Sequence, residues 1–343
     1  MLKNATGFIF PAKIINSFHG PLPSWWGRGV DAIAPRASII YSAFVSAGDI
    51  AGWPRSVKSR VEMSTGEIVD ESEFKRISKI SMEPSDLDLQ RAHAQRLSGE
   101  YVYLGWLFGH YGHFLTETLS RFWYCLERTA PRRFLVHANY RKFSEFPSHV
   151  VKVLKYFGIN EGNLTIVREP VNVDVLHCPE QALRCDDSVG SHLRAVYKEI
   201  SSKFSCKFEG VERVYVSRKS LLGDQRGFNE NEVREIIEDL GFFVISPESL
   251  PFEEQLEIYS NCRYLVGPVG SGMHNAAFMP EGGKVLILAP NNFLFKNDCL
   301  LAAANGYDLQ YFISGNSESA EIKQSRWSVD LDDFKQSINF WMS

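Results

Sequence analysis

The sequence has no Cys-x-x-Cys pair, no long apolar run and no excess of basic residues. Its six cysteines are scattered over 343 residues, which excludes zinc-ribbon and dithiol redox motifs and argues against a disulfide framework. No segment approaches the roughly 18 uncharged apolar residues that would span a bilayer. The net charge of -4, from 37 basic and 41 acidic residues, provides no electrostatic reason to bind nucleic acid.

The beginning of the sequence, MLKNATGFIFP, also lacks the apolar core of about 7–15 residues that marks a secretory signal peptide. We interpret the cysteines as reduced thiols in the core. Both observations predict a cytoplasmic protein without an integral membrane segment. No basic amphipathic helix is evident, so any membrane association would be peripheral, at the inner face.

The second half of the chain carries a strong α/β pattern. Hydrophobic residues make up 44% of the chain, which excludes a disordered protein. Short apolar runs that alternate with helical stretches are typical of a parallel sheet covered by helices, which binds ligands at the carboxyl ends of its strands. We expect strands at 213–217, 242–245, 264–267, 284–288 and 309–313, and helices at 229–241, 252–261, 297–305 and 329–341.

The first two hundred residues are less regular. We expect a strand at 37–45 and a hairpin within 61–70, because turn residues separate apolar stretches there. From about residue 100 the pattern again becomes α/β. It predicts helices at 113–128, 150–157 and 188–204 and strands at 134–136 and 164–167, followed by a linker at 205–210.

The first motif with chemical potential spans residues 109–121. In a helix, His110, His113, Glu117 and Arg121 would share one face. Such a row offers a proton acceptor, an orienting partner and a cation, which are the groups that activate a hydroxyl as a nucleophile. The alternative is an amphipathic helix with a solvated polar face. A zinc site is the weaker interpretation, because no third ligand has a suitable spacing.

The second motif is VGPVGSGMHN at residues 266–275, between a strand and a helix. Glycines allow the backbone to approach a phosphate, and a helix N-terminus offers free N–H groups to it. The spacing matches neither a dinucleotide-binding fingerprint nor a P-loop, which argues against an oxidoreductase or an NTPase. A tight turn without a ligand is the alternative. The candidate phosphate-binding residues are Gly270, Ser271, Gly272 and Asn275.

The third motif follows the strand at 213–217. Arg218 lies at its carboxyl end, where an arginine is suited to clamp a diphosphate. The alternative is an ordinary exposed basic residue at a strand end. Arg226 and Asn229 follow along the chain, and Glu248 could either contact a ribose or cap the helix at 252–261.

Taken together, these motifs resemble glycosyltransferase family 61, in its bacterial capsule-type branch. The similar segments include VYVSR at 214–218, LPFEEQ at 250–255, the block at 267–275 and FMP at 278–280. The segment at 109–121 is similar to the family's other signature, which has a histidine, an acid four residues later and then an arginine. The resemblance covers about residues 100–310. The family often has Asn where this chain has His110, and His-Gly in place of Val269-Gly270.

The resemblance implies a GT-B-like α/β architecture of two Rossmann-like domains that face a cleft. It implies an inverting transfer from a nucleotide-sugar donor to a hydroxyl of a glycan or lipid-linked glycan, in the biosynthesis of a surface polysaccharide. Such a reaction needs a base near the acceptor and positive charge on the leaving diphosphate. Glu117 or His113 would be the base, either as a His–Glu dyad or by direct carboxylate catalysis. His110 and Arg121 would serve the acceptor, and Arg218 with the 270–272 turn the donor.

We accordingly predict three segments. Residues 1–206 form an acceptor-side α/β domain with an irregular β-rich start, and 207–315 form the nucleotide-sugar-binding Rossmann-like domain. Residues 316–343 provide a terminal helix, capped by Ser328 or Asp330, which packs back on the N-terminal domain.

No cofactor is required beyond the donor substrate, and the question of a metal ion stays open. No Asp-x-Asp element follows a strand convincingly, because helix capping explains the nearest candidate, Asp186-Asp187. A second class of function is a non-catalytic nucleotide- or glycan-binding relative of the same fold. Such a protein would turn over no nucleotide-sugar.

Overall fold

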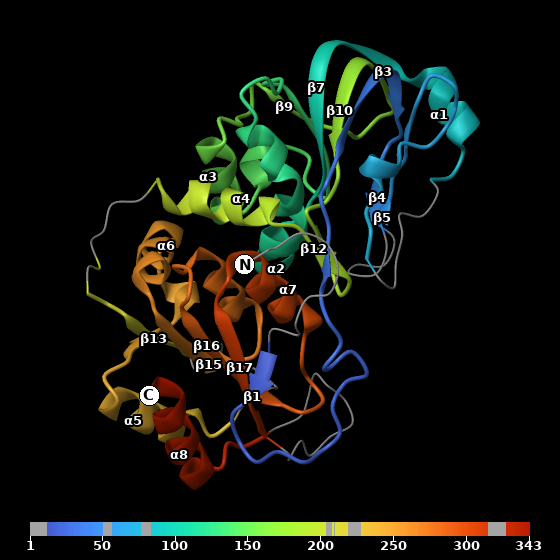
Figure 1. Ribbon diagram of the computed structural model, residues 1–343. Helices are drawn as coiled ribbons and strands as arrows, with labels where there is room; N and C mark the ends of the chain where they lie inside the picture. The colour runs from blue at the N-terminus through green and yellow to red at the C-terminus, as the bar shows by residue number, and fades with distance from the viewer. Residues whose placement is uncertain are drawn as a thin grey trace. The chain divides into compact units, whose positions relative to one another are not determined.

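The computed structural model describes residues 12–50, 57–76, 84–203, 208, 210–218, 228–314 and 327–343. It divides into two compact units (Figure 1). The N-terminal unit is Ile33–Ile200, and the C-terminal unit combines Met1–Ala32 with Ser201–Ser343. The five cysteines of the described residues are buried and free.

A six-stranded sheet with parallel neighbours throughout forms the centre of the C-terminal unit. Its order is β1-β17-β16-β15-β13-β14. The strands are β1 (Ala12–Ile14), β13 (Arg213–Val216), β14 (Phe243–Ile245), β15 (Tyr264–Pro268), β16 (Lys284–Pro290) and β17 (Asp308–Ser314). The helices are α5 (Glu230–Asp239), η5 (Pro247–Ser249), α6 (Phe252–Asn261), η6 (Ser271–Phe278), α7 (Lys296–Asn305) and α8 (Leu331–Met342).

This order confirms the predicted parallel α/β pattern and locates a reversal in it. Counted from β13, the strands lie in the order 2-1-3-4-5, as in doubly wound folds. The chain therefore leaves β13 in one direction and resumes at β15 in the other. Ligands of such sheets bind at this switch point, outside the carboxyl ends of the two strands.

Both ends of the described chain join the C-terminal unit. Strand β1 pairs with β17, so it extends this sheet instead of belonging to the predicted segment 1–206 (Figure 1). Helix α8 also differs from the prediction that it packs on the N-terminal domain. Its apolar side chains Phe334, Ile338 and Trp341 lie at helical spacing and share one cluster with residues of the sheet and of α5. Asp330 caps the helix, as predicted, and accepts hydrogen bonds from two backbone N–H groups.

The N-terminal unit contains a mixed six-stranded sheet of order β6-β3-β10-β7-β8-β9. The last four strands are parallel, whereas β3 runs antiparallel to both of its neighbours. The strands are β3 (Ala37–Val45), β6 (Val61–Glu62), β7 (Gln95–Leu107), β8 (Phe134–Ala138), β9 (Leu164–Ile166) and β10 (Val171–Pro179). Helical segments are η1 (Asp70–Ser72), α1 (Leu87–His93), η4 (Phe143–Glu145), α3 (Ser148–Tyr156) and α4 (His192–Ser201).

Shorter strands lie outside the two large sheets. They are β2 (Asp31–Ala32), β4 (Asp49–Ile50), β5 (Val57–Lys58), β11 (Leu183–Arg184) and β12 (Ser188–Val189). β11 and β12 pair as a hairpin, so α4 starts later than the predicted helix at 188–204. Asp186, with a φ of 60°, lies in the hairpin turn instead of capping a helix.

The predicted helix at 113–128 is a continuous run of three helical types. It comprises α2 (Tyr111–His113), a π-helical segment η2 (Phe114–Thr118) and a 3-10 segment η3 (Leu119–Leu126). Phe114, Leu115 and Leu119 are fully buried, so this apolar side of the helical run packs in the core of the unit. π-helical segments inside helices are frequent at functional sites, and this one contains Glu117.

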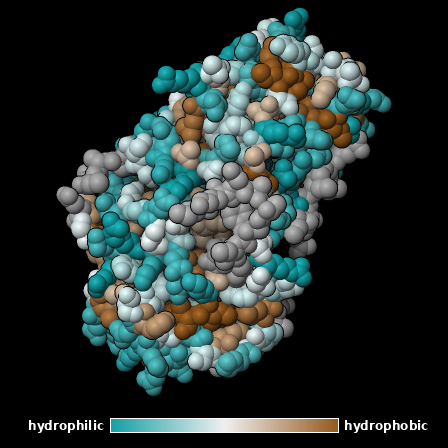
Figure 2. Space-filling model, in the orientation of Figure 1, coloured by the Kyte–Doolittle hydropathy of each residue, from teal (hydrophilic) through white to brown (hydrophobic). Residues whose placement is uncertain are grey.

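The surface shown in Figure 2 is mostly hydrophilic, with hydrophobic residues in small separate groups. Singly exposed apolar residues are normal on a folded protein. Within the described ranges, no helix combines the length and the apolar character that crossing a membrane requires.

Candidate active site

The helical run of the N-terminal unit brings His113 and Glu117 into direct contact. The Nδ1 of His113 lies 2.6 Å from the Oε2 of Glu117. The Glu117 side chain has no exposed surface, whereas 30% of the His113 side chain is exposed. The carboxylate is therefore enclosed by the protein, and the imidazole is the member of the pair that can meet a substrate.

A third residue completes this group. Arg76 donates from Nη2 to Glu117 Oε2 at 2.6 Å, and its Nε donates to Glu117 Oε1. Its Nη2 also lies 3.3 Å from the Nδ1 of His113. The backbone of Arg76 forms a bridge with Cys185, next to the β11–β12 hairpin. No pattern in the sequence identifies Arg76 as a site residue, because it belongs to the irregular first hundred residues and shares no spacing with the helix motif.

The contacts of Glu117 determine its charge. Burial raises the pKa of this carboxyl, but hydrogen bonds from His113 and Arg76 outweigh burial, and the net pKa lies below its usual value. Burial lowers the pKa of Arg76, and Glu117 more than restores it. The pair is therefore ionised at neutral pH. An ionised carboxylate can only accept hydrogen bonds, so Nδ1 of His113 carries a proton and Nε2 of the neutral ring does not.

His110 lies beside this group, as the sequence predicts. Its ring centroid is 5.1 Å from that of His113, and the residue is exposed. Phe108 contacts the His113 ring from another side, in an edge arrangement at 6.2 Å. An exposed imidazole next to an aromatic ring can contact a hydroxyl-rich ligand.

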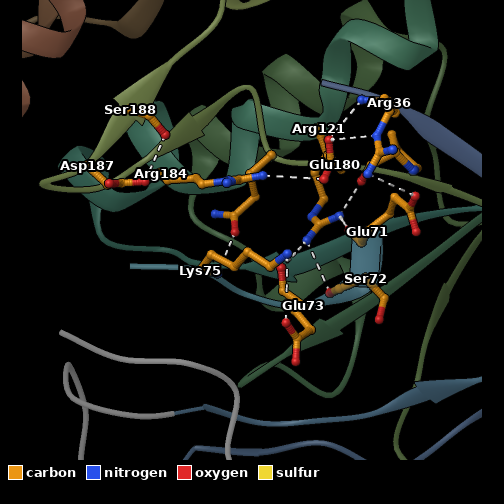
Figure 3. Close-up of polar contacts among 12 residues, drawn as sticks. Arg36, Glu71, Ser72, Glu73, Lys75, Arg121, Glu180, Arg184, Asp187 and Ser188 are labelled. Carbon is orange, nitrogen blue, oxygen red and sulfur yellow. Dashed lines mark hydrogen bonds and ion pairs between the residues drawn. The ribbon is translucent and has the colours of Figure 1, made fainter. Parts of the chain in front are cut away.

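Arg121 does not join the group, although it follows Glu117 by one helical turn. It is 2% exposed, and its guanidinium donates to four backbone carbonyls (Figure 3). Gly105 makes room for it, since a Cβ there would lie 2.7 Å from the Arg121 Nε. This placement does not support an acceptor contact by Arg121. The accepting carbonyls belong to Glu71, Ser72, Glu73 and Pro179.

In the C-terminal unit, Arg218 lies at the switch point of the sheet. It directly follows Ser217 at the end of β13, and its Nη1 donates to the carbonyl of Val269, just after β15, at 3.1 Å. Its backbone N–H donates to Oε1 of Glu230 at 2.9 Å. The guanidinium therefore spans the two strands between which the chain direction reverses.

The glycine turn after β15 lies against the same guanidinium. Gly270 has a φ of 151°, and a Cβ there would lie 2.7 Å from the Arg218 Nη1. Ser271 and Gly272 open η6, and their exposure is intermediate. Asn275 is fully buried and donates to the Gly272 carbonyl at 3.1 Å. The structure thus brings Arg218 together with the predicted turn, and Asn275 holds the turn from inside.

Three further residues, Asn229, Glu248 and Arg226, are predicted to bind the donor. The amide of Asn229 makes two hydrogen bonds with the backbone of Val329, at 3.0 and 2.8 Å, so it fastens α5 to the segment before α8. Glu248 lies in η5, beyond β14 at the edge of the sheet. Arg226 lies outside the described residues.

Comparison with known proteins identifies the family. The model of the glycosyltransferase 61 family matches residues 111–286, which is just over half of the chain. The match begins at the helical run of His113 and Glu117, and it includes Arg218 and the glycine turn. A search of curated proteins finds no match. The chain belongs to glycosyltransferase family 61 and is a glycosyltransferase.

Proposed function

We propose that the protein transfers a sugar, with inversion, from a nucleotide-sugar to a hydroxyl of a glycan or glycolipid. We further propose that it belongs to the bacterial capsule-type branch and acts in the biosynthesis of a surface polysaccharide. In this proposal the fold is GT-B-like, with donor binding by the C-terminal unit and acceptor binding by the N-terminal unit. Family membership supports the reaction class, and the described residues suggest the roles that follow.

The observation that carries the mechanism is the contact between His113 Nδ1 and Glu117 at 2.6 Å. Because Nδ1 carries the proton of the neutral ring, Nε2 is the nitrogen that can accept one. His113 takes the proton of the acceptor hydroxyl as the oxygen attacks the anomeric carbon. The bond from that carbon to the diphosphate oxygen breaks on the opposite face, and the nucleoside diphosphate leaves with the electron pair. Glu117 stabilises the imidazolium that forms.

The donor diphosphate binds at the switch point of the C-terminal sheet. Arg218 supplies a permanent positive charge there, and the start of η6 supplies backbone N–H groups from Ser271 and Gly272. Both stabilise the charge that develops on the leaving group. Because these groups carry the charge, we propose that no metal ion is required, and a chelator should leave the rate of transfer unchanged.

Exposed His110 contacts the acceptor in this proposal, and Glu248 contacts the donor ribose. The protein works in the cytoplasm, at the inner face of the membrane where a lipid-linked acceptor is present. The five buried, free cysteines of the described residues support a reducing compartment.

The test is a transfer assay with UDP-, GDP-, CMP- and CDP-sugars and a set of glycan acceptors. We expect turnover with one donor, a higher melting temperature with that donor, and a product of inverted anomeric configuration by NMR. His113→Ala should lower kcat by roughly 10²–10⁴-fold, while His93→Ala, in exposed α1, should not. A retained configuration would overturn the inverting mechanism. No turnover and no thermal shift with any donor would overturn the proposed function.

A further inference from the structure

We propose that Arg76 is a positioning residue that makes Glu117 an orienting carboxylate and thereby makes His113 the base. This inference rests on the proposed function. Arg76 lies upstream of the family-matched segment, which starts at residue 111, and its side chain reaches Glu117 across 41 positions of sequence.

Arg76 prevents Glu117 from taking part directly in catalysis. Its Nε binds one carboxylate oxygen and its Nη2 binds the other, so the pair is bidentate. The second oxygen also binds His113. With no exposed side-chain surface, Glu117 cannot reach an acceptor hydroxyl. The carboxylate can act only through the imidazole.

Arg76 also determines which nitrogen of His113 carries the proton. A buried carboxyl without a cation favours its neutral form, and a neutral Glu117 would donate its own proton to Nδ1. The ring would then carry its hydrogen on Nε2, and no lone pair would face the acceptor. Arg76 prevents this, because a guanidinium stays protonated and stabilises the ionised carboxylate.

Among the residues that the structure describes, the other charged or titratable groups around Glu117 cannot replace Arg76. Burial raises the pKa of Cys185, the thiol beside the carboxylate, well above its usual value, and this thiol stays neutral. Asp186 acts on Arg76 and Cys185 with the same sign of charge as Glu117. His110 contacts the His113 ring, with centroids 5.1 Å apart, and no bond from it to Glu117 is found among the described residues. Arg76 is thus the cation that bonds to both carboxylate oxygens.

The same unit contains a matched control in the pair Arg91–Glu62. Arg91 binds both oxygens of Glu62, at 2.9 and 2.8 Å, and Glu62 is 1% exposed. Each arginine also lies over a phenylalanine ring, Arg76 over Phe74 and Arg91 over Phe44. Arg60 Nε also lies 2.6 Å from Glu62 Oε1. Loss of Arg91 therefore removes a similar bidentate ion pair that has no part in the proposed reaction, and Glu62 keeps Arg60 as a second cation.

The experiment compares Arg76→Met, Arg76→Lys and Arg91→Met with the wild-type protein. For Arg76→Met we expect a loss of kcat on the order of 10²-fold, as for removal of a general base, with little change in the KM for the donor. The acidic limb of the kcat/KM profile should move to higher pH, because Glu117 loses the cation that keeps it ionised. Arg76→Lys should recover part of the rate, and Arg91→Met should keep the wild-type profile.

A second measurement does not depend on turnover. In protein labelled with 15N-histidine, the His113 signals are assigned by their loss in His113→Ala. We expect a proton on Nδ1 in the wild type and a shift toward Nε2 in Arg76→Met. An unchanged tautomer and an unchanged pH profile would overturn the role of Arg76. If Arg76→Met does not fold, Arg76→Gln, which also lacks the positive charge but keeps a polar side chain, decides by the same two readouts. A wild type without transferase activity but with the expected tautomers would count against the proposed function alone.

Discussion

The two candidate sites are built in different ways. In the N-terminal unit, charged side chains from distant parts of the chain meet in a mostly buried cluster around Glu117. In the C-terminal unit, one arginine and a glycine-rich turn follow the two strands at the reversal of a parallel sheet. The first arrangement is suited to moving a proton and the second to holding an anion. A site made of a backbone turn is visible in a short stretch of sequence. A site made of charged side chains from distant segments is not.

The largest effect should come from His113→Ala. Loss of the base should lower kcat by roughly 10²–10⁴-fold, while the thermal shift caused by the donor stays at its wild-type size. Steady-state kinetics and thermal melts check both. Equal loss of donor binding and turnover would contradict the assignment of proton transfer to His113 and of donor binding to the C-terminal unit.

Arg121→Met should mainly affect stability. It would leave four backbone carbonyls without their partner inside the unit, at a cost of about 3 kcal/mol in the free energy of unfolding. Urea denaturation measures this, and Arg36→Met, whose side chain is 75% exposed, is the control. Wild-type stability together with a raised KM for the acceptor would instead restore the acceptor role of Arg121.

Arg218→Met should weaken donor binding. Loss of a charge-assisted hydrogen bond to the diphosphate costs about 1.5–3 kcal/mol, or roughly 10–150-fold in Kd. Calorimetry with the active donor measures the change. Arg213→Met is the control, because Arg213 is the first residue of the same strand and lies at its amino end, away from Arg218. An unchanged donor Kd would move the donor site away from the switch point.

Gly270→Ala should have the smallest effect, about tenfold or less in donor Kd, from backbone strain and a displaced Arg218. The matched control is Gly282→Ala, since Gly282 also has a positive φ, of 78°, but has open space around it. Equal donor binding by both variants would show that the close approach of the turn to Arg218 does not matter.

Much of the fold can be predicted from the sequence where the signal is local. Strand β3 and helix α6 have the predicted bounds, and β13 to β17 lie within two residues of theirs. Apolar runs of four or five residues separated by helical stretches suffice for this. The sequence pattern does not predict strands β7 and β10, because these long strands lie in a part of the chain where strands and helices do not alternate regularly.

The candidate sites follow the same rule. The row of His113 and Glu117 can be predicted, since helical spacing places them one turn apart. Arg121 follows Glu117 at the same spacing. Its side chain is nevertheless buried, because its guanidinium binds backbone carbonyls of residues 71–73 and 179. No local pattern contains that information. The prediction that Arg121 contacts the acceptor follows from its helical spacing, and its buried position in the structure does not support it.

The sequence by itself determined the parallel α/β character of the second half, the turn at 270–272 and the pairing of His113 with Glu117. Periodicity and glycine conformation encode these features over a few residues. Only the tertiary structure placed Arg76 on Glu117, buried Arg121 and added β1 and α8 to the C-terminal unit. The physical reason is that a buried charge takes its partner from whichever segment packs against it, and sequence distance does not limit that choice.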